Sequence, residues 1–190
     1  MCLAIATWEN SVAKETSAIT LFGSLALLFC VISAYATDSD PRHADSEDRH
    51  GYVLKPGEGE DDGFGGLIKA SPKTGTQGVV WVEDRMPPSV TSGIHLHLEA
   101  DEFFYVLDGT GHFRLEAEEH QIGAGGMIFV PLKTEHRITS SKDDPLHVIF
   151  IVDRPGLAEQ FRMGLDRTEM TLEEFNAIVE KYGTVYKTFD

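Results

Sequence analysis

The chain has 190 residues, enough for one compact domain with additional segments, and a core of that size needs neither a disulfide nor a metal merely to fold. Its formal net charge is -15, from 16 Lys and Arg against 31 Asp and Glu, which opposes binding to nucleic acid and to anionic membrane surfaces. Both cysteines, Cys2 and Cys30, precede residue 37, so a mature chain without that segment has neither a disulfide nor thiol chemistry.

Residues 1–36 predict a secretory leader. Residues 18–36 carry no charge and end in Ala34-Tyr35-Ala36, a small-residue pattern typical of signal-peptide cleavage. We therefore expect cleavage after Ala36 and a secreted or extracytoplasmic protein. The apolar run is nearly long enough to cross a bilayer and no positive cluster precedes it, so an uncleaved signal anchor with single-pass membrane attachment is the alternative.

The next segment, residues 37–50, is rich in charge and has no apolar periodicity, so we expect a disordered tether. From residue 51 to 152 the pattern changes to short apolar or alternating runs broken by Gly, Pro and Asp, which predicts an all-β sandwich or barrel. The expected strands are residues 67–70, 78–82, 94–98, 102–107, 112–115, 127–130, 136–139 and 146–152. The body of the protein is therefore predicted to be built from short strands.

Residues 153–190 predict a helical extension. Pro155 can open a short helix, and a second one is expected over residues 171–182 because Thr171 and Glu174 form a potential capping box. One apolar stripe follows that second helix, and Gly183 can end it. We expect this extension to pack against the barrel or against a partner subunit.

Four side chains of the predicted strands form a candidate metal site. His95 and His97 are two apart in a strand, so they point to the same face. Glu102 follows a bend that can bring it inward beside them in an antiparallel neighbour, and His136 begins a separate strand that barrel closure can bring to the same centre. Three imidazoles and one carboxylate suit a divalent transition metal such as Fe, Mn, Ni, Cu or Zn, and they leave coordination positions open for catalysis.

The same residues give the chain a resemblance to a known family. His95-x-His97, Glu102 and Gly109 have the spacing of the first motif of cupins, with Ser89 where that motif begins with glycine. The second cupin motif is met by Gly125, Pro131 and His136, while Lys133 and Ser140 replace its later glycine and asparagine. The resemblance covers about residues 51–152 and is to single-domain cupins similar to quercetin dioxygenase.

The resemblance implies a jelly-roll barrel, or double-stranded β-helix, with a metal held by the four residues, and a homodimer paired through barrel edges. It also implies a dioxygenase whose small enolic or phenolic substrate binds the metal and reacts with O₂, with Glu102 as the base that removes the substrate proton. Phe104 and Val106 share parity with Glu102 and are expected to line the cavity, with Met127 and Phe129 or their neighbours adding apolar wall.

Two other functions use the same residues. The centre can act as a Lewis acid for isomerase, lyase or decarboxylase chemistry without incorporating oxygen. A secreted binding protein that holds a metal or a small ligand without turnover is the third hypothesis, and germin-like oxalate or superoxide activity ranks below these. Of the remaining histidines, His112 is expected to face outward, His120 to lie in a hairpin turn, and His147 to have a structural role.

Overall fold

The computed structural model describes residues 50–163 and 167–189. The expected leader, residues 1–36, and the expected tether up to residue 49 lie outside the described residues. Within the described part of the chain, no helix is both long enough and apolar enough to cross a membrane.

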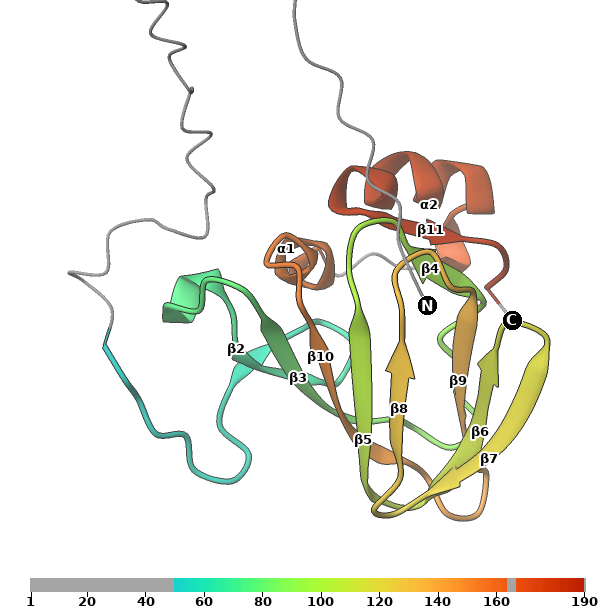
Figure 1. Ribbon diagram of the computed structural model, residues 1–190, viewed down its shortest axis with the longest axis horizontal. Coiled ribbons are helices and arrows are strands. Elements are labelled where there is room, and N and C mark those ends of the chain that lie inside the picture. Colours follow the sequence, from blue (N-terminus) through green and yellow to red (C-terminus); the bar gives the residue numbers. More distant parts are fainter. Residues whose placement is uncertain (1–49, 164–166, 190) are drawn as a thin grey trace, which may run out of the picture. The chain divides into compact units, whose positions relative to one another are not determined.

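The described residues fold mainly into two antiparallel sheets (Figure 1). The six-stranded sheet has the order β1-β2-β3-β10-β5-β8, with bounds Glu60–Asp61, Leu67–Ala70, Val80–Arg85, His147–Val152, Glu102–Asp108 and Met127–Val130. The five-stranded sheet has the order β11-β4-β9-β6-β7, with bounds Thr184–Tyr186, His95–His97, His136–Ser140, Thr110–Leu115 and Glu118–Gly123. This architecture confirms the predicted all-β jelly-roll fold, in which each sheet buries one face.

The hydrophobic core lies between the inner faces of the sheets. In β5, the buried residues Phe104 and Val106 alternate with the exposed residues Phe103 and Tyr105, as a half-buried strand requires. The main core cluster draws on both sheets and contains Met86, Phe104, Val106, Phe113, Val130, Ile138, Leu146 and Val148. The two sheets therefore share one core.

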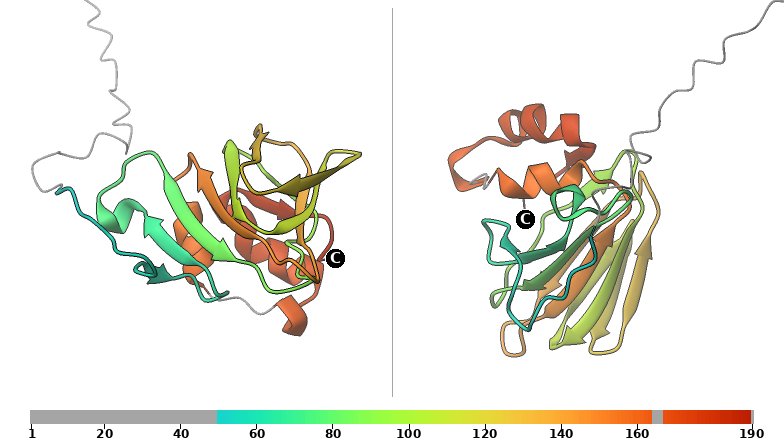
Figure 2. Two further views of the ribbon diagram at one scale, coloured as in Figure 1. Left: turned by 90° about the horizontal axis from the view of Figure 1, so that it is seen from below. Right: turned by 90° about the vertical axis from the view of Figure 1, so that its left-hand side faces the viewer.

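The C-terminal segment lies at one end of the sheets, as the three views show together (Figures 1 and 2). It contains α1 (Leu157–Arg162) and α2 (Leu172–Val179), and the predicted Thr171–Glu174 capping box is present at the start of α2. Single 3₁₀ turns occur at Pro72–Thr74, Arg167–Glu169 and Glu180–Tyr182. Gly183 follows the last of them with φ of 87°, a left-handed conformation that favours glycine.

Besides the two-residue strand β1, two strands were not expected from the sequence. The residues placed in a hairpin turn, Glu118 to His120, belong to β7, and the turn itself is at Glu116, whose φ is 54°. All of β7 is exposed or half-buried, so no apolar alternation marks it. The second unexpected strand, β11, follows Gly183 and pairs with β4, the strand that carries His95 and His97.

Candidate metal centre

The four predicted ligand residues lie together at the end of the sandwich below the C-terminal segment. His95 and His97 point inward from β4, and His136 pairs directly with His95 across the β4–β9 ladder. Glu102 is the first residue of β5, which belongs to the opposite sheet. The expectation that Glu102 lies in an antiparallel neighbour of β4 is therefore wrong, because the bend at residues 99–101 carries the chain from one sheet to the other.

All four side chains are removed from bulk water. The exposed fractions are 7% for His95, 5% for His97, 4% for Glu102 and 0% for His136. Their nearest ligand atoms, one from each residue, all lie within 4.8 Å of one another. Ligands bound at about 2.0–2.1 Å to one metal ion are separated by at most about twice that distance, so small side-chain movements would let all four residues bind one ion.

Each imidazole is held by its Nδ1 atom. His95 Nδ1 donates to the carbonyl of Gly93 at 3.1 Å, and His136 Nδ1 donates to the carbonyl of Thr134 at 2.9 Å. His97 Nδ1 lies 3.2 Å from the hydroxyl of Thr184 in β11. Because a carbonyl can only accept, the Nδ1 atoms of His95 and His136 carry protons, so the neutral form of each ring has its lone pair on Nε2.

The Nε2 atoms of His97 and His136 lie 3.1 Å and 2.9 Å from the same carboxylate oxygen, Glu102 Oε2. His97 Nε2 is hydrogen-bonded to this oxygen, whereas the buried Nε2 of His136 has no hydrogen-bond partner. The unpartnered Nε2 of His136 and the carboxylate oxygen beside it are both electron-rich, so a cation bound between them would stabilise the pair. The donor set therefore fits a bound metal ion, which would pair with all of these atoms at once.

The pKa shifts of His95, Glu102 and His136 agree with this arrangement. Burial, reinforced by the neighbouring imidazoles, holds the pKa of His95 well below its usual value, so that ring is neutral. Burial alone would raise the pKa of Glu102, but attraction to His97 and contacts with both imidazoles lower it, so that the side chain is a carboxylate. For His136, burial lowers the pKa, but contact with the Glu102 carboxylate outweighs burial and raises it.

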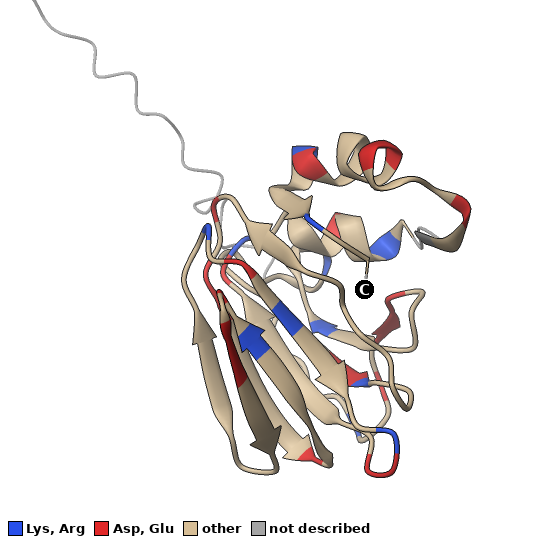
Figure 3. Ribbon diagram, turned by 90° about the vertical axis from the view of Figure 1, so that its right-hand side faces the viewer, with Lys and Arg blue, Asp and Glu red and all other residues tan. Residues whose placement is uncertain are grey.

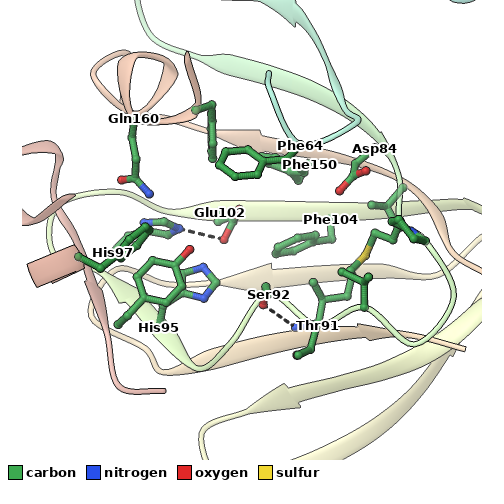
Figure 4. Close-up of a pocket in the computed structure, with 18 residues that line it drawn as sticks. Phe64, Asp84, Thr91, Ser92, His95, His97, Glu102, Phe104, Phe150 and Gln160 are labelled. Carbon is green, nitrogen blue, oxygen red and sulfur yellow. Dashed lines mark hydrogen bonds and ion pairs between the residues drawn. The ribbon is translucent and has the colours of Figure 1, made fainter. Parts of the chain in front are cut away.

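A cavity of about 290 Å³ is lined by three of the four residues, His95, His97 and Glu102 (Figure 4), whereas His136 does not line it. Apolar side chains form much of its wall, among them Met86, Phe104, Val148, Phe150, Phe161 and Phe175. Phe104 lines it as predicted, but Val106 lies in the core instead. Met127 and Phe129 face outward and are 64% and 43% exposed, because the β5–β8 register places Ile128 and Val130 on the inner face.

Several lining residues were missed by sequence reasoning. Asp84 lines the cavity from β3, Gln160 from α1 and Tyr186 from β11. The Tyr186 ring stacks on His95 at 4.9 Å, and Thr184 on the same strand contacts His97. The sequence indicates β11 only through three residues after Gly183 that suit a strand, and it does not indicate which strand they pair with.

The departures from the cupin motifs have local structural explanations. Ser89 and Lys133 stand where the motifs have glycine, and each has φ of 62°, the left-handed conformation that glycine adopts without strain. The turns are thus preserved. Ser140, in place of asparagine, is buried, and its hydroxyl accepts a hydrogen bond from the backbone N–H of Leu146 at 3.0 Å.

Two further histidines of the described residues, His112 and His147, lie away from the centre. His112 is exposed on β6, and His147 lies on the outer face of β10, where it pairs with Glu83 at 2.8 Å. His147 therefore has a structural contact and does not reach the cavity.

Comparison with known proteins identifies the domain. Residues 82–152 match the family described as the cupin domain. An uncharacterized protein of Methanocaldococcus jannaschii is 32% identical over 56 residues, a match that covers 30% of this chain and less than half, 45%, of that relative. The chain thus contains a cupin domain, which confirms the predicted resemblance at the level of the family.

Two solved structures are reported for comparison. A cupin protein from Bacteroides fragilis is 14% identical with a TM-score of 0.46, over 56% of this chain and 85% of that one. A predicted oxalate decarboxylase from Thermotoga maritima is 21% identical with a TM-score of 0.42, over 46% of this chain and 77% of that one.

Proposed function

We propose that the protein is a metal-dependent cupin enzyme whose active site is the cavity beside His95, His97, Glu102 and His136. The observation that carries this proposal is the arrangement of the imidazoles. Two of them have an Nδ1–H fixed by a backbone carbonyl, and their Nε2 atoms converge with a carboxylate at one point of a cavity. Because a chain of 190 residues needs no metal merely to fold, a metal there would serve function rather than folding.

Within this class we propose a dioxygenase that acts on a small enolic or phenolic substrate. A bound divalent transition metal would supply Lewis acidity toward the substrate oxygen and a site for O₂. Glu102 holds a carboxylate at the cavity wall and is our candidate for the base that accepts the substrate hydroxyl proton. The apolar wall would exclude water and hold a flat organic molecule against the centre.

The first experiment tests the metal centre itself. The full chain should contain, or bind after chelation and dialysis, one divalent transition metal per chain, measured by elemental analysis. His136→Ala should lower metal affinity by at least about tenfold, because it removes one ligand from the set. His112→Ala, which removes an exposed imidazole from β6, is the matched control and should bind metal like the original chain. Equal metal binding by both variants would refute the centre.

The second experiment tests the reaction. Oxygen consumption with flavonols, diketones and oxalate would distinguish oxygenase activity from the second candidate, Lewis-acid isomerase, lyase or decarboxylase chemistry, which uses no oxygen. Glu102→Gln is compared at restored metal occupancy, and unchanged turnover would reject the role of Glu102 as a base. A metal-loaded protein with no turnover across the panel would favour a secreted binding protein.

A further inference from the structure

Outside the metal centre, the cavity contains hydrogen-bond acceptors that lack donors. Gln160 is 7% exposed, it lines the cavity from α1, and its Oε1 atom is buried without a hydrogen-bond partner. Asp84 lines the cavity from β3, and no hydrogen bond or ion pair joins its carboxyl to the described residues. No lysine or arginine is among the described residues that form the wall.

The register of the six-stranded sheet places Asp84 far from the metal centre. Asp84 is opposite Val148 on β10, whereas Glu102 is opposite Val152 on the same strand. The two carboxylates share the inner face of the sheet and are four residues apart along it, which corresponds to about 13 Å. Figure 4 shows Asp84 and the imidazoles at opposite ends of the cavity, with Phe104 between them.

The end of the cavity near Asp84 is both negative and aromatic. Phe64 and Phe150 lie beside Asp84 (Figure 4). The loop that carries Phe64 is held by buried Asp62, whose Oδ1 accepts hydrogen bonds from the backbone N–H groups of Phe64 at 2.8 Å and Gly66 at 2.9 Å. Burial, assisted by repulsion from Asp62, raises the pKa of Asp84 to about 6, so near pH 7.5 the side chain is a partly buried carboxylate without a counter-ion.

We propose that this end of the cavity is a subsite for a cationic nitrogen, so that the ligand is a small organic amine whose ammonium group meets Asp84. An ammonium donates hydrogen bonds to the carboxylate, and the faces of Phe64 and Phe150 attract its positive charge. The formal net charge of -15 attracts such a ligand from solution. The inference deepens the proposed function, on which it rests for the metal-binding end of the ligand, by naming a charge that the substrate carries.

Binding of three probes of similar size tests the subsite. The probes are phenethylamine, 2-phenylethanol and phenylacetate, titrated calorimetrically into the full metal-free chain at pH 7.5. We expect phenethylamine to bind about tenfold or more tightly than the alcohol, because a hydrogen bond to a charged group is stronger than a neutral one, and phenylacetate to bind most weakly. Absence of phenethylamine binding, or equal affinity for the amine and the alcohol, would overturn the proposal.

Two variants test whether Asp84 causes the preference for the amine over the alcohol. Asp84→Asn keeps the shape of the side chain and should abolish the discrimination between amine and alcohol. Asp143→Asn removes the same charge from an exposed turn and should leave the discrimination unchanged. Persistence of the preference in a folded Asp84→Asn protein would overturn the proposal. The comparison within the original chain needs no variant, so it decides the question even if substitution at Asp84 prevents folding.

The proposed function and the cationic subsite can be refuted independently. Loss of the metal centre with a retained amine preference would refute the proposed function alone. Metal binding without an amine preference would refute the cationic subsite alone.

Discussion

Asp84 lies on the inner face of β3, where the other inward residues, Val80 and Val82, are fully buried. Its pKa is raised to about 6 from an ordinary value of 3.8, first by burial and then by Asp62. The folded state therefore binds this proton more tightly than the unfolded state does, so stability is lost as the pH rises from about 4 to about 6. Above that range the full cost of the buried charge remains.

Asp84→Asn removes this cost, so we predict a higher melting temperature than that of the original chain at pH 7.5, with the difference vanishing near pH 4. Thermal unfolding monitored by circular dichroism between those pH values, with a chelator present in both samples, measures the effect. A melting-temperature difference that does not change with pH would mean that the Asp84 carboxyl is well solvated.

Lys133 adopts φ of 62° in the turn between β8 and β9, a position where the cupin motif has glycine. A left-handed residue other than glycine costs about 1–2 kcal/mol, part of which glycine returns through its greater freedom in the unfolded chain. We predict that Lys133→Gly increases the free energy of unfolding by about 1 kcal/mol, measured by urea denaturation.

The control for that substitution is Lys142→Gly, at an exposed loop residue that is not in the left-handed region. It should leave stability unchanged or lower it. A loss of stability in Lys133→Gly as large as in the control would show that the lysine side chain outweighs the backbone strain.

The strand β11 connects the C-terminal segment to the metal centre. It pairs with β4 and places the Thr184 hydroxyl 3.2 Å from Nδ1 of His97. Thr184→Val keeps the shape of the buried side chain but removes the hydroxyl that contacts His97. We predict a loss of metal affinity of about 10–100-fold, because the orientation of the ring depends on that contact.

A competition assay with a chromogenic chelator measures this affinity. Thr184→Ser retains the hydroxyl and should stay within a few fold of the original chain. Val185→Thr changes the neighbouring, half-buried position of the same strand and controls for general disturbance of β11. Equal affinity in Thr184→Val and Thr184→Ser would remove Thr184 from the centre.

The limits of prediction from sequence are visible in individual strands. The strand β5 alternates buried and exposed residues, and the His-x-His spacing fixes the face of β4, so both elements and the four grouped residues could be anticipated. The sequence of β7 shows no alternation of apolar residues, because all of its residues are exposed or half-buried. The strand is held only by its pairing with β6. The pairing of β11 with β4 joins segments about 90 residues apart, and no local pattern encodes such a contact.

The polar residues that line the cavity could not be predicted from the sequence for a similar reason. Asp84 lies beyond the expected strand 78–82, and its inward direction follows only from the register of β3 with β10. Gln160 has no special spacing at all. The sequence motifs therefore locate the metal end of the cavity, whereas the groups that would recognise the rest of a ligand emerge from the packing of distant elements.

The charged residues of the domain are interspersed around its strands and C-terminal segment (Figure 3). The outer face of the six-stranded sheet, in contrast, carries apolar side chains in register across neighbouring strands. Phe103 stacks on Phe129 at 4.9 Å, and Tyr105 is opposite Met127. Their exposed fractions, 39% for Phe103, 43% for Phe129, 47% for Tyr105 and 64% for Met127, are high for such large apolar or aromatic side chains. An exposed apolar face of this kind is typical of an interaction surface.

The resemblance to cupins implies a homodimer paired through barrel edges. We propose that two copies of the chain pair through this outer face, and we predict a homodimer at micromolar concentration. Phe129→Glu places a charge on this face, in the edge strand β8, and should give a monomer in sedimentation velocity. Metal affinity should stay unchanged because the side chain points away from the metal centre. Val53→Glu adds the same charge at a 91% exposed residue before β1 and should leave the dimer intact. If the original chain sediments as a monomer, the apolar face does not support self-association, since a stable interface of about 800 Å² per partner would hold at that concentration.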